Sequence, residues 1–449
     1  RNRPQECPEA GFGVKRQDRR HLALAGRSPW TWVPTLYFVE GVPYFLVNNL
    51  SVVMFKRLGM GNAELAFWTS LLYLPWVAKP LWSPLVDVVR SKRWWILAMQ
   101  LALAASFAAV ALLLPRRTGA AFGPFVPSLV LFHLAAVLSA THDIAADGFY
   151  MLALDAHRQS LFVGIRSTFY RLAGIFGQGI LVVVAGILET RLGDIPRAWT
   201  ATFLGCGALL LAASAWHLFV LPRPEGEAAK EAPRAVGGKE FLRAFATFFQ
   251  KPFIGPALAF LLLYRLPEAL ALKMLSPFLL DKPEAGGLGL STAQTGIVFG
   301  TVGVAALTVG GILGGIFAAR VGLKKSLWPM AASLALPCAA YLYLALFPPA
   351  GMWPVCACVA VDQFGYGFGW TAYMLFMMWF SQGEYATSHY AVCTAGMAAG
   401  MMLPGFVAGV LQEWLGYAGF FALVMVACLA TAAVTASLPK RIPADYARK

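Results

Sequence analysis

The chain of 449 residues is 59% hydrophobic and only 13% charged, with a formal net charge of +14. A soluble globular chain is usually about 45–50% apolar and about 25% charged, so this composition excludes an ordinary water-soluble protein. Because apolar runs of about 20 residues recur, each long enough to cross the hydrocarbon core of a bilayer, we predict an all-α polytopic membrane protein.

The basic excess would fit a nucleic-acid partner, but its distribution argues against one, because Lys and Arg cluster in short segments between the apolar runs, as orientation signals do. Residues 1–32 form a basic tail without the apolar core of a signal peptide. The chain begins with Arg1 rather than Met, so the sequence leaves open where the true start lies. The seven cysteines form no disulfide or zinc pattern, and we expect packing roles for them and neither a metal nor a cofactor.

Long apolar segments broken by charge, Gly and Pro predict twelve membrane-spanning helices. The first six are expected at 33–55, 65–87, 94–114, 125–154, 162–188 and 198–221. The other six are expected at 253–280, 293–319, 325–347, 353–381, 387–412 and 416–438. We therefore expect two six-helix bundles, 33–221 and 252–449, joined by a linker at 222–251 that ends in an amphipathic segment. Counting Lys and Arg between the spans places the linker and both termini in the cytoplasm.

The loop that follows the second span has a counterpart in the second half. The stretches "SPLVDVVRSKR" (83–93) and "GIFAARVGLKK" (315–325) each leave the second helix of a half, and their basic pairs align. Such a repeat indicates a duplicated transporter scaffold, and it resembles the loop motif of the major facilitator superfamily. Ala319 stands where the motif has an acid, so the second half should lack one gating contact. At these helix ends we expect a conformational latch made by Asp87, Arg90, Lys92, Arg93, Arg320, Lys324 and Lys325.

Several stretches carry a more specific resemblance. The strings "FVEGVPYFL" (38–46), "AKPLWSPLVD" (78–87) and "HDIAADG" (142–148) are similar to the AmpG muropeptide permeases and to related acetyl-coenzyme A transporters. The stretch 386–421 resembles the last helical pair of the AmpG group. The resemblance implies a major facilitator fold in the inner membrane and proton-linked import of anhydro-muropeptides, which are cell-wall turnover products. We expect a monomer.

Ionisable residues inside the predicted spans are the candidate functional residues, because a charge at the bilayer centre costs at least about 2.5–3.5 kcal/mol and tends to face a cavity or a partner. Pro267 interrupts the helix that carries three of them, and broken helices are where transporters bind cargo. We expect proton coupling or a substrate cavity to involve Glu40, Lys79, Asp143, Asp147, Arg166, Arg171, Arg265, Glu268, Lys273 and Asp362.

Asp143 and Asp147 are four residues apart and therefore share one helical face. Two carboxylates that close repel each other, so one of them is favoured to take up a proton. We expect Asp143 to be the coupling group, with Glu40 as the next candidate. Static ion pairing with Arg166 or Arg171 on the next helix is the structural alternative, and those arginines would otherwise clamp a carboxylate or phosphate of the cargo.

Other functions remain open. The cargo would alternatively be an acyl-coenzyme A or another anionic solute. From another class, the chain would be a membrane-embedded transferase that uses His142 with Asp143, or a sensor that binds without transport. No Walker loop, zinc motif or nucleophile constellation appears, so we expect a transporter and not an enzyme.

Overall fold

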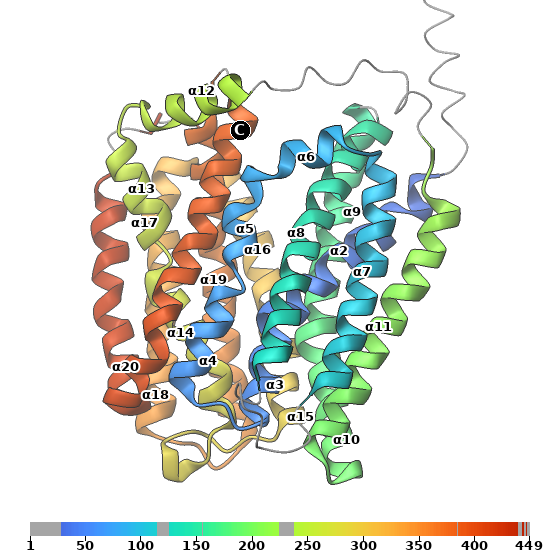
Figure 1. Cartoon of the computed structure of the whole chain (residues 1–449). Helices are drawn as coiled ribbons and strands as arrows, with labels where there is room; N and C mark the ends of the chain where they lie inside the picture. The colour runs from blue at the N-terminus through green and yellow to red at the C-terminus, as the bar shows by residue number, and fades with distance from the viewer. Residues whose placement is uncertain are drawn as a thin grey trace, which may run out of the picture.

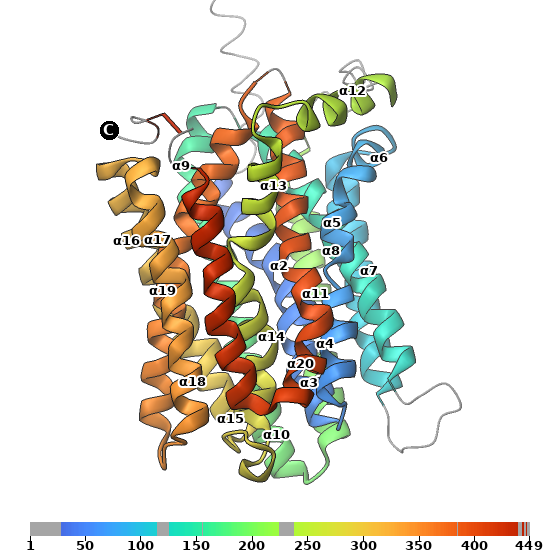
Figure 2. The same ribbon diagram turned by 90° about the vertical axis from the view of Figure 1, so that its left-hand side faces the viewer.

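The computed structural model describes residues 28–114, 125–154, 156–223, 238–383, 385–438, 442–443 and 446. These residues form a bundle of long helices that run side by side, and one shorter helix, α12 (Gly238–Phe249), lies across one end of it (Figures 1 and 2). We call this the α12 end. The opposite end, which carries the last turns of α10 (Leu181–Leu192) and all of α15 (Thr292–Thr295), is the α10 end.

The first half of the chain, residues 28–223, folds into six long helical stretches. Several are interrupted by wide π turns or tight 3-10 turns, both written η. In chain order the elements are η1 (Pro29–Thr31), α2 (Val33–Phe45), η2 (Leu46–Leu50), α3 (Ser51–Arg57), α4 (Asn62–Leu71), α5 (Leu74–Ala78), η3 (Lys79–Leu81), α6 (Ser83–Val88), α7 (Lys92–Leu113), α8 (Val126–Ala153), α9 (Ala156–Gly174), η4 (Ile175–Ile180), α10 and α11 (Ile195–Val220).

The second half, residues 238–446, follows the same plan after α12. Its elements are α13 (Ile254–Leu263), α14 (Leu266–Leu280), η5 (Pro283–Ala285), α15, η6 (Gly296–Gly303), α16 (Val304–Val321), α17 (Leu323–Ala335), η7 (Leu336–Cys338), α18 (Ala339–Leu346), α19 (Met352–Ser381) and α20 (Ala386–Ala436). Helix α20 is two helices that meet at a kink, because Gly416 has a positive φ of 67° there.

The prediction of an all-helical membrane protein is confirmed. Within the described residues, eight helical stretches are long and apolar enough to cross a membrane, and the kinked α20 supplies one of them. Three predicted spans are not among the eight. Two of these are broken helices, interrupted at Pro80 and before Pro267, and the third carries Asp362 and Gln363.

Three wide π turns mark the centre of the bundle. Segment η2 lies on the first predicted span, η4 on the fifth and η6 on the eighth, and η4 contacts both of the others. A π turn widens the helix and leaves its backbone pattern irregular, and such turns are frequent at functional sites. The η4 and η6 segments can approach each other closely because Gly179 faces Gly300. A Cβ on Gly179 would lie only 3.0 Å from the Gly300 carbonyl.

Some predicted features lie outside the described residues. These are residues 1–27 of the basic tail, 224–237 of the linker, and Cys7. The predicted amphipathic end of the linker corresponds in position to α12. Its Phe248 is buried against the rings of Phe380 and His389, while Phe249 is exposed. The six cysteines within the described residues are free thiols.

Candidate functional site

The two aspartates of α8 lie one turn apart and bind different partners. Asp147 forms an ion pair with Arg166 of α9, with 2.7 Å between Oδ1 and Nη2. Tyr37 of α2 donates its hydroxyl to the same Oδ1 at 3.0 Å. The Arg166 guanidinium lies over the Tyr37 ring, 4.3 Å from its centroid. This arrangement joins three helices around one carboxylate.

Asp143 pairs with Lys79, and its carboxyl lies close to that of Glu40. Lys79 opens η3, where Pro80 prevents regular helix, so its side chain leaves a break in the second span. Glu40 is only 6% exposed, and its Oε2 has no hydrogen-bond partner. Two carboxyl groups share a hydrogen bond only if one of them carries a proton, because ionised carboxylates only accept. The arrangement can therefore hold one proton between Glu40 and Asp143.

The first helix stays regular around Glu40, although Gly41 and Pro43 follow it directly in the sequence. Helix α2 continues through Gly41 and Pro43 and widens into η2 only afterwards. Gly41 is needed because α9 passes close by, where an added Cβ would lie 2.7 Å from the Ala173 side chain. Glu40 is thus held on regular helix between α8 and α9.

In the second half, Arg265 and Glu268 form a buried ion pair at the break before α14. The distance between Nη2 and Oε2 is 2.9 Å, and the side chains are 6% and 3% exposed. The guanidinium also donates to the Tyr366 hydroxyl at 3.0 Å and lies 4.6 Å from the Trp370 ring centroid. Pro267 occupies the first turn of α14, where a missing N–H costs nothing, and this sets Arg265 at the helix start.

Two further cations reach from one half of the chain to the other. Lys273 of α14 donates to the Thr69 hydroxyl of α4 at 3.2 Å. Arg171 of α9 donates to the Thr308 carbonyl of α16 at 3.3 Å. The expectation that Arg171 faces the aspartates of α8 is wrong, because its guanidinium turns across the interface toward α16. Arg166 alone of the two arginines pairs with an α8 aspartate.

Asp362 lies apart from these groups, inside the second half. It is 3% exposed and accepts hydrogen bonds from Tyr341 at 2.6 Å and from Gln363 at 2.9 Å. Its hydrogen-bond partners are neutral, whereas Asp143, on the corresponding helix of the first half, pairs with a lysine.

The predicted latch residues lie at the α12 end. Arg93 donates to the carbonyls of Leu218 and Leu221, at 2.5 and 3.4 Å, and so caps the end of α11. Lys92 is buried against Gly148 of α8, and Arg90 lies 5.9 Å from the Trp94 ring centroid. The side chain of Asp87 is outside the described part of the structure. In the second copy, Arg320 and Lys325 are exposed and Lys324 is half-buried.

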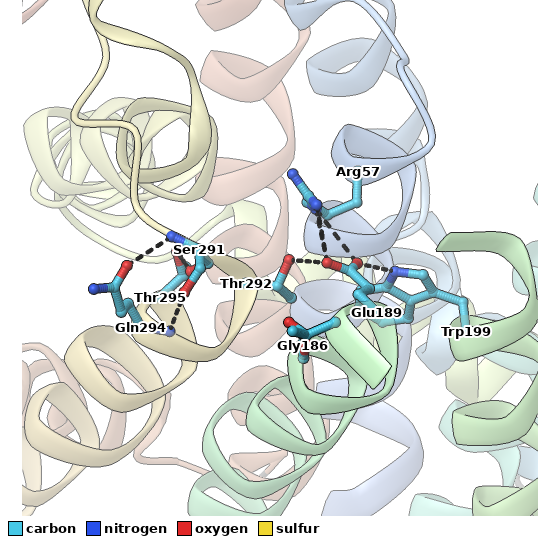
Figure 3. A network of polar contacts seen from close by, with 9 residues as sticks. Arg57, Gly186, Glu189, Trp199, Ser291, Thr292, Gln294 and Thr295 are labelled. Atoms are coloured by element: carbon cyan, nitrogen blue, oxygen red, sulfur yellow. Dashed lines mark hydrogen bonds and ion pairs between the residues drawn. The ribbon is translucent and has the colours of Figure 1, made fainter. Parts of the chain in front are cut away.

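A polar network that the sequence does not predict joins the two halves at the α10 end (Figure 3). Glu189 of α10 accepts from Arg57 at 3.0 Å, from Trp199 at 2.8 Å and from Thr292 of the second half at 2.7 Å. Three donors on one carboxylate make a strong, charge-assisted set. Gly186 permits the approach, because a Cβ there would lie 2.9 Å from the Cα of Ala293.

A second network lies near the first. Lys56 pairs with Asp281 at 2.7 Å, and Tyr417 donates to the other oxygen of that carboxylate at 2.6 Å. Asn62 donates to Gln412 at 2.6 Å. These contacts also join the first half to the second, so the halves are tied together at the α10 end. A signal for these networks in the sequence is the basic pair at 56–57, which lies at the end of the first span that the orientation bias places outside the cytoplasm.

His142 has different hydrogen-bond partners from its neighbour Asp143. It is 1% exposed, and its Nε2 lies 3.0 Å from the amide nitrogen of Gln100, whose oxygen lies 3.0 Å from Nδ1 of His217. The side-chain amide links α7, α8 and α11 within the first half. Among the described contacts, Asp143 pairs with Lys79 and His142 with Gln100, rather than with each other as a transferase would require.

Comparison with known proteins places the chain among transporters. The family model described as Major Facilitator Superfamily matches residues 35–386. The chain is 25% identical to the anhydromuropeptide permease of Escherichia coli strain K12 over 399 residues, which cover 88% of this chain and 76% of that protein. It is also 25% identical over 405 residues to an uncharacterized protein of Haemophilus influenzae, with coverage of 86% and 88%. The resemblance to AmpG permeases predicted from the sequence is confirmed by the first of these relatives.

Solved structures agree on the fold. A point mutant of the nucleoside transporter NupG superposes with a TM-score of 0.68 at 16% identity, and the match covers 90% of this chain and 97% of that one. The xylose transporter XylE from Escherichia coli superposes with a TM-score of 0.62 at 13% identity, covering 89% and 94%. At these identities the likeness establishes the fold, as the sequence analysis predicted it, and leaves cargo open.

Proposed function

The chain belongs to the Major Facilitator Superfamily, and on that premise we propose that this membrane transporter is a proton-coupled importer of anhydro-muropeptides. The cargo assignment is supported by the similarity to a relative named anhydromuropeptide permease. The proposal places the protein in the inner membrane as a monomer, with the α12 end and both termini in the cytoplasm, as the distribution of Lys and Arg favours.

The observation that carries proton coupling is the closeness of the Glu40 and Asp143 carboxyls beside Lys79. When the shared proton is present, Lys79 neutralises Asp143 and Glu40 stays uncharged in its buried position. When the proton leaves, two negative charges compete for one ammonium group. The charge balance of α2, α5 and α8 therefore depends on a single proton.

Coupling also requires two conformations that differ in proton affinity, because a ligand that binds both states equally shifts nothing. The networks around Glu189 and Asp281 tie the halves at the α10 end, which is the periplasmic end in this proposal. The structure is then the state closed to the periplasm. Opening the α10 end would break these ion pairs, and protonation of the Glu40–Asp143 pair would help to offset that cost.

Uptake by proteoliposomes tests the proposed function. With radiolabelled anhydro-muropeptide outside and the membrane potential clamped, an inward gradient of one pH unit should support up to about tenfold accumulation for one proton per cargo molecule. Liposomes without a gradient should only equilibrate. Acetyl-coenzyme A serves as the competing cargo. If it accumulates and the muropeptide does not, the cargo assignment is wrong. If the muropeptide accumulates equally without a gradient, the proton coupling is wrong.

A further inference from the structure

Lys273 is a buried cation whose surroundings lack a counter-charge. It is 8% exposed on α14, and its ammonium contacts the Thr69 hydroxyl and lies 5.5 Å from the ring centroid of Tyr73. Within the described residues, no carboxylate lies within ion-pair distance of its Nζ. Lys79, Arg166 and Arg265 differ from it, because each of them pairs with an acid. A buried charge without a partner is costly, so a chain that keeps one has a use for it.

Lys273 lines a small cavity of about 20 Å³ at the interface of the two halves. The first half contributes Asn48 and Asn49 from the π turn η2, and the second half contributes Ser276 and Phe299. A neighbouring cavity shares Asn49, Ser276 and Phe299 and adds Gln178 from the π turn η4. The polar groups around the ammonium are thus amides and hydroxyls, and they come from helices that must separate when the transporter changes state.

Asn48 supplies an independent sign that a ligand belongs here. Its amide nitrogen donates to the Tyr44 carbonyl at 3.1 Å, which fixes the orientation of the amide and leaves Oδ1 as the open group. That oxygen is buried and has no hydrogen-bond partner, and the residue is 3% exposed. Buried polar atoms are almost always satisfied, so an orphaned acceptor in a cavity indicates a missing donor.

We propose that Lys273 and Asn48 form a subsite for a carboxylate of the cargo that lies next to an N–H or O–H group. The ammonium would bind the carboxylate, and Asn48 Oδ1 would accept the adjacent donor. One cation among neutral amides matches a single negative charge and does not match a pyrophosphate. An N-acylated amino acid or peptide end has this chemistry. The inference rests on the proposed transport function. It specifies which chemical group of the cargo binds in the cavity that Lys273 lines.

The thermal stability of Lys273 variants distinguishes a ligand-binding role of this residue from a purely structural one. If Lys273 only held α4 against α14, its replacement would destabilise the protein. If Lys273 instead binds an anion of the cargo, replacing it by glutamine or methionine removes an uncompensated buried charge from the cargo-free protein. That protein should then unfold at the same or a higher temperature. Lys282, which is exposed after the same helix, is the matched control for Lys→Gln.

Binding measurements with matched acid and amide ligands test the proposal. The ligands are anhydro-muropeptide, N-acetyl-alanyl-glutamate, and the form of each with its carboxylates converted to carboxamides. Lys273→Gln should weaken binding of the acids about 10- to 100-fold, the usual worth of a hydrogen bond to a charged group, and should change binding of the amides little. Lys273→Arg should recover part of the loss, and Lys282→Gln should bind all four ligands as the parent does.

The outcomes distinguish the subsite from the cargo assignment. If the muropeptide fails to bind the parent but the acetylated dipeptide binds in a Lys273-dependent way, the subsite holds and the named cargo is wrong. If the muropeptide binds and Lys273→Gln weakens the acid and its amide equally, the subsite is wrong while the transport function stands. Absence of acid binding to the parent, or a loss of thermal stability in Lys273→Gln, also overturns the subsite.

Discussion

Replacing Glu40 by glutamine is expected to abolish accumulation of cargo against a gradient while preserving exchange of cargo across the membrane. Glutamine keeps the size and the uncharged state of the protonated carboxyl, so the helix packing around Gly41 should survive. It cannot release a proton, however, and the Glu40–Asp143 pair then has one charge state in both conformations. A one-unit pH gradient that supports up to about tenfold accumulation in the parent should support none in the variant. The measurement is labelled-cargo uptake and counterflow in proteoliposomes.

Two further variants, an exposed control and a change of the partner acid, test this result. Glu64→Gln makes the same chemical change at an exposed position in the first turn of α4, and it should accumulate cargo like the parent. Asp143→Asn removes the partner of Lys79 as well as an acid, so it should also lose accumulation and, in addition, exchange more slowly. If Glu40→Gln and Asp143→Asn both accumulate cargo normally, the proton is carried elsewhere, and Asp147 becomes the next candidate.

Replacing Arg265 by glutamine should produce the largest loss of stability among the ion pairs of this site. Glu268 would stay buried with no cation to balance it, and its Oε1 already lacks a hydrogen-bond partner. Breaking a buried pair by removing one partner typically costs about 3–5 kcal/mol. Unfolding titrations in mixed micelles, followed by tryptophan fluorescence, measure the change in the free energy of unfolding.

The chain offers a matched control and a rescue for this variant. Arg197 and Asp194 form another pair three residues apart, but it is exposed, with side chains 76% and 34% accessible. Arg197→Gln should therefore cost only about 0–1 kcal/mol. The double variant Arg265→Gln with Glu268→Gln should recover most of the stability, because both charges are removed together. A double variant as unstable as Arg265→Gln would show that the loss comes from the Tyr366 and Trp370 contacts.

Much of the fold was predictable because the bilayer imposes a simple rule on composition. Runs of apolar residues of the right length must be helices there, and the described chain is helical at each of the twelve predicted segments. The charged side chains inside these runs were equally visible, since each stands out against an apolar background. The spacing of Asp143 and Asp147 correctly placed them on one face of α8.

The pairing of those charges was not predictable, because it depends on which helices are neighbours. Arg171 is only five residues from Arg166, yet a turn of about 100° per residue points it to the other half of the chain. The networks at the α10 end are built from residues at helix ends, such as Glu189 and Asn62, where polar side chains are common and carry no signal by themselves. The π turns at η2, η4 and η6 also leave no clear pattern, since their residues suit an α-helix equally well.

The most direct test of the central claim, that cargo and protons move together, is the proton movement that cargo itself drives. Proteoliposomes loaded with a fluorescent pH indicator start with equal pH on both sides and a clamped membrane potential, and anhydro-muropeptide is then added outside. The lumen should acidify as cargo enters, whereas Glu40→Gln liposomes should take up cargo to equilibrium without a pH change. Entry of cargo into parent liposomes with the lumenal pH unchanged would contradict proton coupling at the Glu40–Asp143 pair.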